Sequence, residues 1–169
     1  MCDFVVLVDE KDQKKGLMEK IKAHKNGILH RAFSVFIFNT RGEILLQKRA
    51  KNKYHSPLLW TNAVCSHPKD GESYKEGAVR RLKEELGVSV PIDEKFHFIY
   101  KAYVGKGLWE HELDYVFAGI YEGGFLLNPG EVAEVRYISV EALSNEMREK
   151  PENFTAWFKI ILREYKEYL

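Results

Sequence analysis

The pattern of hydrophobic and polar positions predicts a series of short strands separated by helices. Apolar runs, alternating or continuous, predict a first strand at Phe4–Val8 and further strands within residues 32–49, 95–104, 109–121 and 131–140. Within residues 32–49, two such runs meet at Asn39–Gly42, a junction typical of a hairpin. The polar stretch 9–16 predicts a turn after the first strand.

Two segments have helical spacing instead. In residues 72–86, Val79, Leu82 and Leu86 form an apolar stripe at intervals of three and four, and Gly87 is placed to end the helix. The charged residues of this segment fall into two neighbouring rows, Glu72, Glu76, Arg80 and Glu84 in one and Arg81 and Glu85 in the other. The tail from Val140 is expected to be helical. Its apolar face comprises Phe154, Trp157, Phe158, Ile161, Leu162 and Tyr165.

These elements predict an α+β fold in which a mixed sheet is sandwiched between helices. The chain shows no internal repeat, linker or low-complexity segment, so we expect a single domain over residues 1–169. Hydrophobic residues make up 45% and charged residues 30%, the proportions of a globular chain. A formal net charge of +1 gives no global field that would favour nucleic acid or membrane surfaces. No apolar run is long enough to span a bilayer, and the first residues do not resemble a signal peptide. We therefore expect a cytoplasmic protein, monomeric or weakly dimeric.

The stretch TNAVCSHPKDGES, residues 61–73, places Cys65 two residues before His67 in a turn-like segment. The sequence contains two cysteines, Cys2 and Cys65, which is weak evidence for a disulfide in a chain with intracellular features. A metal site, a catalytic thiol and simple core packing remain open for Cys65.

Histidines and carboxylates provide a candidate metal site. The period of two places Glu110, Glu112 and Asp114 on one face of a predicted strand. Imidazole and carboxylate groups together suit a divalent transition metal. The candidate ligands, drawn from three separate segments, are His24, His30, His67, Glu110 and Glu112. Scattered surface histidines and an acidic strand face would give the same pattern. The other histidines, His55, His97 and His111, have no comparable neighbours in sequence and are assigned no role.

The helix at 72–86 resembles the Nudix box, Gly-x5-Glu-x7-Arg-Glu-apolar-x-Glu-Glu-x-Gly-apolar. The matching positions are Glu72, Arg80, Leu82, Glu84, Glu85, Gly87 and Val88. Ser66 replaces the first glycine, and Arg81 replaces the glutamate that follows the arginine. Clustered carboxylates in such a box hold Mg²⁺ against a diphosphate, whereas an arginine can pair with a phosphate directly. A solvated helix held by ion pairs is the alternative without function.

Five segments together resemble type I isopentenyl diphosphate isomerases: HRAFSVFIFN, WTNAVCSHP, GES, RRLKEELGV and EHELDY. The resemblance extends from about Lys20 to Trp157. It implies a single Nudix-type domain that converts isopentenyl diphosphate to dimethylallyl diphosphate in isoprenoid biosynthesis. The implied reaction is metal-dependent and passes through a carbocation-like intermediate by protonation and deprotonation. An alkene is a very weak base, so the proton donor must be held in place by the site.

The resemblance also implies roles for individual residues. Cys65 and Glu112 would be the acid–base pair, and Tyr100 would assist Glu112. Zn²⁺, Mn²⁺ or Mg²⁺ would be bound by His24, His30, His67, Glu110 and Glu112, and Glu85 would help to hold a Mg²⁺ on the substrate diphosphate. The diphosphate oxygens would be bound by Lys20, Arg49, Lys53 and Arg81. Trp157 would lie against the hydrocarbon end and stabilise a cation there by roughly 1–2 kcal/mol.

Two other functions fit part of the sequence. A Nudix hydrolase of a nucleoside or other diphosphate would keep the metal-binding helix but would not need Cys65 or Trp157. A non-catalytic metal-binding or regulatory domain would bind metal without turnover, and the set of acid–base candidates argues against it.

Overall fold

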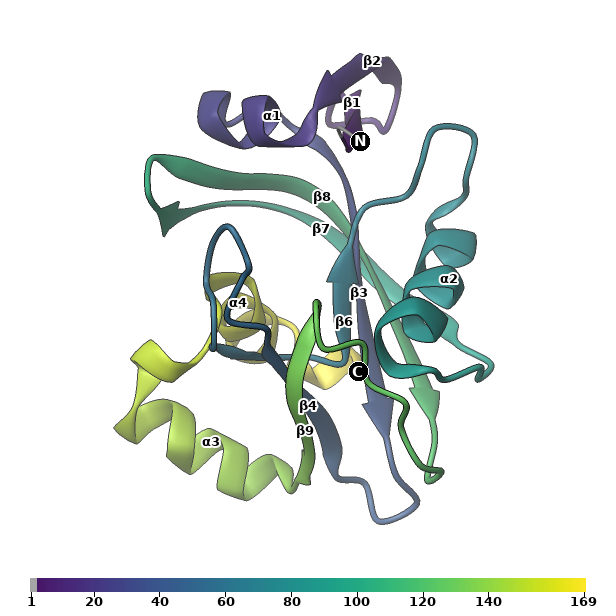
Figure 1. Ribbon diagram of the computed structural model, residues 1–169, viewed down its shortest axis with the longest axis vertical. Helices are drawn as coiled ribbons and strands as arrows, with labels where there is room; N and C mark the ends of the chain where they lie inside the picture. Colours follow the sequence, from purple (N-terminus) through teal and green to yellow (C-terminus); the bar gives the residue numbers. More distant parts are fainter. Residues whose placement is uncertain (1–2) are drawn as a thin grey trace.

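Residues 3–169 are described by a computed structural model, in which strands form one mixed sheet with helices on both faces (Figure 1). The central strand is β3 (His30–Phe38). It pairs antiparallel with β1 (Phe4–Val8) and β6 (Val64–Ser66), and parallel with β8 (Leu108–Ile120). This parallel pair makes the sheet mixed, as predicted.

The remaining strands extend this sheet by antiparallel pairing. The long strand β7 (Asp93–Gly105) continues it beyond β8, and β2 (Lys14–Glu19) continues it beyond β1. On the other side, β4 (Ile44–Arg49) pairs with β9 (Val132–Ile138) and with the short β5 (Trp60–Thr61).

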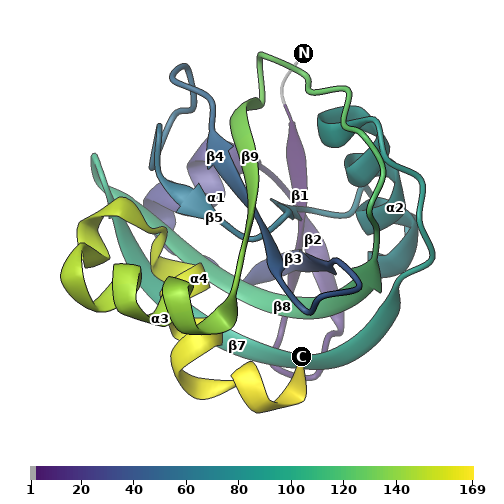
Figure 2. The ribbon, with the colours of Figure 1, turned by 90° about the horizontal axis from the view of Figure 1, so that it is seen from below.

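Helices lie on both faces of the sheet. Seen from below, α2 (Tyr74–Leu86) lies on one side, and α3 (Val140–Glu149) and α4 (Ala156–Glu164) lie on the other (Figure 2). The alternation of side chains along β3 supplies both interfaces, since Phe33 packs in the core beneath α2 and Phe36 in the core beneath α4. The α+β prediction, with a sheet sandwiched between helices, is confirmed. Among residues 3–169, no helix combines the length and the apolar character needed to cross a membrane.

The helix predicted at 72–86 is confirmed as α2, although it begins two residues later, at Tyr74. Ser73 caps its N-terminus in a capping box with Glu76, and Gly87 ends it in the left-handed conformation at φ 68°. The predicted apolar stripe is wrong at one position. Val79 is 38% exposed, and Ala78 is buried instead, because the buried face passes through residues 78, 82 and 86 at intervals of four.

Three other predictions need correction. The β3–β4 connection is a tight turn, but the two strands share a single residue pair, Phe38 with Ile44, because β6 pairs with β3 over Phe33–Val35 and β4 pairs with β5 and β9 instead. The predicted turn at 9–16 ends early, since β2 begins at Lys14. The helical tail is interrupted at Pro151, which begins a short 3₁₀ helix before α4.

Candidate active site

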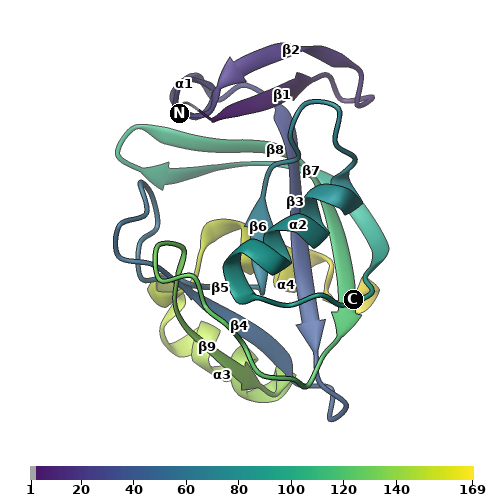
Figure 3. The ribbon, with the colours of Figure 1, turned by 45° about the vertical axis from the view of Figure 1, so that its right-hand side comes forward.

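The five predicted metal ligands meet at one end of the sheet. His24 lies on α1 (Lys20–Asn26), a short helix above the β7–β8 pair (Figure 3). His30 begins β3, and the register of the parallel β3–β8 pair places it beside Glu112. One ligand atom from each of the five residues lies within 4.8 Å of every other: His24, His30, His67, Glu110 and Glu112.

The donor set fits a divalent metal. Nδ1 of His24 contacts the carbonyl of Lys20 (2.6 Å) and Nδ1 of His30 contacts that of Ile28 (2.8 Å), so that both Nε2 atoms face the cluster. His30 Nε2 is buried and finds no hydrogen-bond partner among residues 3–169. Burial lowers the pKa of His67 to about 3, which keeps that imidazole in the neutral form that binds metals. Nitrogen and oxygen donors of this kind suit zinc or manganese better than calcium.

The two carboxylates of the cluster have opposite pKa shifts. Burial, followed by the negative charge of Glu110, raises the pKa of Glu112 to about 7. Burial also favours the neutral form of Glu110, but hydrogen bonds from His24 and His55 hold the pKa of Glu110 well below its usual value. Glu112 is therefore the carboxyl group of this pair that can exchange a proton near neutrality.

Tyr100 lies directly against this carboxyl group. The β7–β8 register makes Tyr100 and Glu112 partners, and the Tyr100 hydroxyl donates to Glu112 Oε2 over 2.5 Å. Burial, followed by the charge of Glu112, raises the pKa of Tyr100 well above its usual value, so the hydroxyl stays a donor.

Cys65 is a free thiol on β6. Antiparallel pairing places it opposite Ser34, and the two side chains approach to 3.3 Å. The thiol donates to Asn62 Oδ1 and accepts from Trp157 Nε1, both over 2.9 Å. Burial, followed by the charge of Asp114, raises the pKa of Cys65. The resting sulfur is therefore protonated, and the indole N–H is already placed to stabilise a thiolate.

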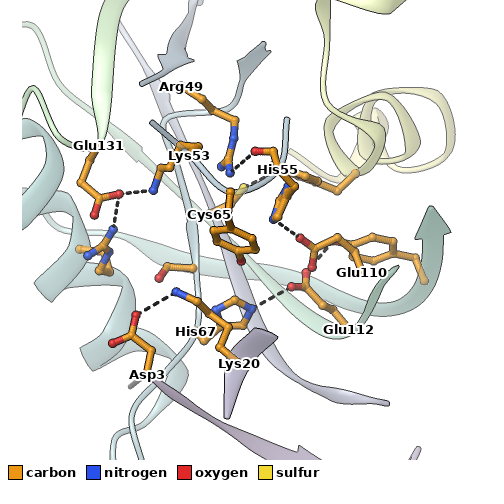
Figure 4. Close-up of a pocket in the computed structure, with 15 residues that line it drawn as sticks. Asp3, Lys20, Arg49, Lys53, His55, Cys65, His67, Glu110, Glu112 and Glu131 are labelled. Atoms are coloured by element: carbon orange, nitrogen blue, oxygen red, sulfur yellow. Dashed lines mark hydrogen bonds and ion pairs between the residues drawn. The ribbon is translucent and has the colours of Figure 1, made fainter. Parts of the chain in front are cut away.

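Four cations line the same cleft as these groups (Figure 4). They are the residues predicted to bind diphosphate, Lys20, Arg49, Lys53 and Arg81. Lys20 pairs with Asp3 over 2.9 Å, and Lys53 pairs with Glu131. The cleft thus places four cations, three of them paired with carboxylates, beside Cys65 and Glu112.

Glu85 lies behind Arg81 rather than on the cleft wall. Its carboxylate, 3% exposed, accepts from Arg81 Nη2 over 2.6 Å and from Gln47 Nε2 over 2.9 Å. Arg81 also reaches Glu131 at 3.1 Å. Although burial opposes its charge, Glu85 and Glu131 raise the pKa of Arg81.

Several cleft residues lay outside the sequence prediction. His55, to which the sequence assigned no role, is buried against Glu110, with Nε2 and Oε1 2.7 Å apart. Asp3 and Glu131 also line the cleft. Asp3, His55 and Glu131 do not belong to a recognisable sequence motif. The only sequence signal for a site residue among them was the histidine in KYHS, residues 53–56, close to Arg49. His97 is exposed, and His111 donates to the carbonyl of Gly27.

The fold and the box on α2 place the protein in a known class. A family model for the NUDIX domain matches residues 28–158. Among solved structures, DR0079 from Deinococcus radiodurans superposes with a TM-score of 0.79 at 17% identity, over 97% of this chain and 100% of that one. A MutT protein from Methanosarcina mazei gives 0.68 at 21% identity, over 82% and 94%. The chain belongs to the Nudix family.

Relatives with higher sequence identity define the family within this class. Isopentenyl-diphosphate Delta-isomerase 2 of Aromatoleum aromaticum is 43% identical over 96% of this chain and 86% of the relative. The isopentenyl-diphosphate Delta-isomerase of Pectobacterium atrosepticum is 44% identical, over 97% and 92%, and that of Aliivibrio fischeri ES114 is 40% identical, over 100% and 98%. Within the Nudix class, the chain is a member of the isopentenyl-diphosphate Delta-isomerase family.

Proposed function

We propose that this protein converts isopentenyl diphosphate to dimethylallyl diphosphate, with a divalent metal in the cluster of histidines and glutamates. The observation that carries the proposal is the composition of one cleft. Two proton-transfer groups, Cys65 on β6 and Glu112 on β8, line it together with four cations and an indole ring. A diphosphate with an alkene tail would use all three kinds of group.

The reaction needs one proton added and one removed. Protonation of the terminal alkene carbon gives a tertiary carbocation, and loss of a proton from the carbon on the diphosphate side moves the double bond without any change in oxidation state. Cys65 and the Tyr100–Glu112 pair are the two groups we assign to these transfers. The raised pKa of Cys65 supports this assignment, because the thiol holds a proton at neutral pH.

Trp157 is assigned to the hydrocarbon end. Its ring is buried, and its Nε1 is fixed by Cys65. An indole face beside the reacting carbons would stabilise a cation by roughly 1–2 kcal/mol in a site without water. The Arg49 guanidinium carbon lies 5.3 Å from the centre of the ring, so one aromatic ring borders both the tail and the diphosphate cations.

The diphosphate is assigned to Lys20, Arg49, Lys53 and Arg81. Guanidinium groups suit phosphate oxygens because their N–H donors form bidentate pairs. Glu85, behind Arg81, would help to hold a Mg²⁺ ion carried by the substrate. Arg81 also distinguishes this site from a diphosphate hydrolase, because it replaces one of the carboxylates with which a Nudix box holds its metal.

The resident metal would be Zn²⁺, Mn²⁺ or Mg²⁺, held by the three histidines with Glu110 and Glu112. When bound, it supplies positive charge that offsets the two buried carboxylates. Further parts of the proposal are a single domain over residues 1–169 and a cytoplasmic monomer or weak dimer. No nucleic-acid partner is expected, in keeping with the net charge of +1.

The first test is incubation with isopentenyl diphosphate and Mg²⁺ in D₂O, followed by proton NMR. Dimethylallyl diphosphate carrying deuterium would support a protonation–deprotonation isomerase. Intact substrate with folded, metal-loaded protein would contradict the proposal, and release of phosphate from a panel of nucleotides would favour a hydrolase.

The assigned acid–base pair has its own test. We expect Cys65→Ala and Glu112→Gln to lower kcat at least about 10³-fold, since each removes one of two required proton transfers. Circular dichroism checks that both variants are folded. Activity above a few per cent in both folded variants would refute the assignment.

A further inference from the structure

His55 is a buried side chain to which the proposed reaction assigns no task. Its ring is 3% exposed and is held through both nitrogen atoms. Nε2 lies 2.7 Å from Glu110 Oε1, and Nδ1 lies 3.3 Å from Ser56 Oγ. A carboxylate oxygen accepts, so the Nε2–H of His55 is the donor in this contact. Figure 4 shows this ring pointing from its loop toward Glu110.

The backbone of His55 belongs to a loop that contains one of the assigned diphosphate cations and directly follows another. This β4–β5 loop, residues 50–59, follows Arg49 and contains Lys53. Arg49 Nη2 donates to the His55 carbonyl and Arg49 Nε to the Ser56 carbonyl, each over 3.1 Å. His55 thus contacts the metal cluster through its side chain and holds a diphosphate cation through its backbone.

The backbone of this loop depends on such contacts. Ser56 and Leu58 have φ angles of 46° and 60°, in the left-handed region that residues other than glycine seldom occupy. A conformation of this kind persists only where surrounding contacts hold it. The hydrogen bonds of His55 and Arg49 are among those that fix the chain on either side of the strained positions.

We propose that His55 is a positioning residue that couples the metal cluster to the diphosphate-binding loop. Its hydrogen bond orients Glu110 toward the metal and, by the same contact, fixes the loop that presents Arg49 and Lys53. Loading the metal site would then order the loop, and ordering the loop would tighten metal binding by the same factor. This inference rests on the metal site and the cation assignments of the proposed function.

The test compares two substitutions of similar size. His55→Gln keeps an N–H donor close to the position of Nε2, whereas His55→Leu does not, and both remove the ring. Affinity for Mn²⁺ alone is measured from the electron paramagnetic resonance signal of the free ion. Deuterium uptake of residues 50–59 is measured by mass spectrometry with and without Mn²⁺. His97→Leu, on an exposed part of β7, is the matched control.

We expect His55→Leu to weaken Mn²⁺ binding about 10- to 100-fold, as is usual when a partner of a metal ligand is lost. The Mn²⁺-dependent protection of residues 50–59 should disappear in the same variant. His55→Gln and His97→Leu should retain most of both properties. His55→Met replaces the leucine variant if circular dichroism shows that the latter is unfolded.

Other results overturn the inference in distinguishable ways. Equal behaviour of the Gln and Leu variants would mean that His55 only packs against its neighbours. Weaker metal binding with unchanged loop protection would remove the coupling, leaving a local effect on Glu110. A wild-type protein that binds no Mn²⁺, Zn²⁺ or Mg²⁺ would overturn the metal site of the proposed function, and this inference with it.

Discussion

Replacing Arg81 with glutamine should destabilise the protein, because Arg81 neutralises a buried carboxylate. Glu85 is 3% exposed and pairs with the guanidinium over 2.6 Å. Removing one partner of a buried ion pair costs about 3–5 kcal/mol when the remaining charge has no other compensation. Gln47 would still donate to Glu85, so we expect the lower end, about 3 kcal/mol. That is a large part of the roughly 5–15 kcal/mol that stabilises a typical domain.

Urea denaturation in the presence of a chelator measures this change in the free energy of unfolding. The midpoint should fall while the slope stays constant, because the surface exposed on unfolding is unchanged. Mg²⁺ at millimolar concentration should restore part of the lost stability, since it supplies positive charge between Glu85 and Glu131. The gain on adding Mg²⁺ should be larger in the variant than in the wild type.

Arg163→Gln is the matched control, because Arg163 is 72% exposed and pairs with a neighbouring surface glutamate. This exposed pair should contribute no measurable stability. A free energy of unfolding of Arg81→Gln within about 1 kcal/mol of the wild type, measured in chelator, would refute the reasoning. A difference that small is typical of an ion pair exposed on the surface.

Two further predictions concern packing and proton transfer. Gly77→Ala should lower stability by up to about 2 kcal/mol in the same denaturation assay, because its Cβ would lie 2.7 Å from Phe33 Cε1. Overpacking costs about 1–3 kcal/mol and is offset by a helix-propensity gain of about 1 kcal/mol. A more stable variant would show that the helix can shift away. Tyr100→Phe should lower kcat about 10- to 100-fold with KM nearly unchanged, since it removes the hydroxyl that donates to Glu112. An unchanged kcat would exclude Tyr100 from the proton transfer.

Much of the local structure could be predicted from the sequence, because it depends on neighbours a few residues apart. The period of two placed Glu110, Glu112 and Asp114 on one face of β8, and all three are buried there. The capping residues of α2 likewise act within a single helical turn. Val79 shows the limit of such reasoning, because the stripe through residues 79, 82 and 86 and the one through residues 78, 82 and 86 are both helical. Only contact with the sheet selects the second.

The five candidate metal ligands were named from the sequence, but their proximity to one another is a property of the tertiary structure. His30 reaches Glu112 because β3 and β8 pair in parallel in one register, and a shift by one residue would turn His30 to the opposite face. The contact of His55 with Glu110 joins residues 55 positions apart, and no local spacing encodes it. The sequence by itself determined which chemical groups are present and which face of each element they occupy. The tertiary structure decided which of them share a cleft, because strand pairing and loop closure depend on the free energy of the whole chain.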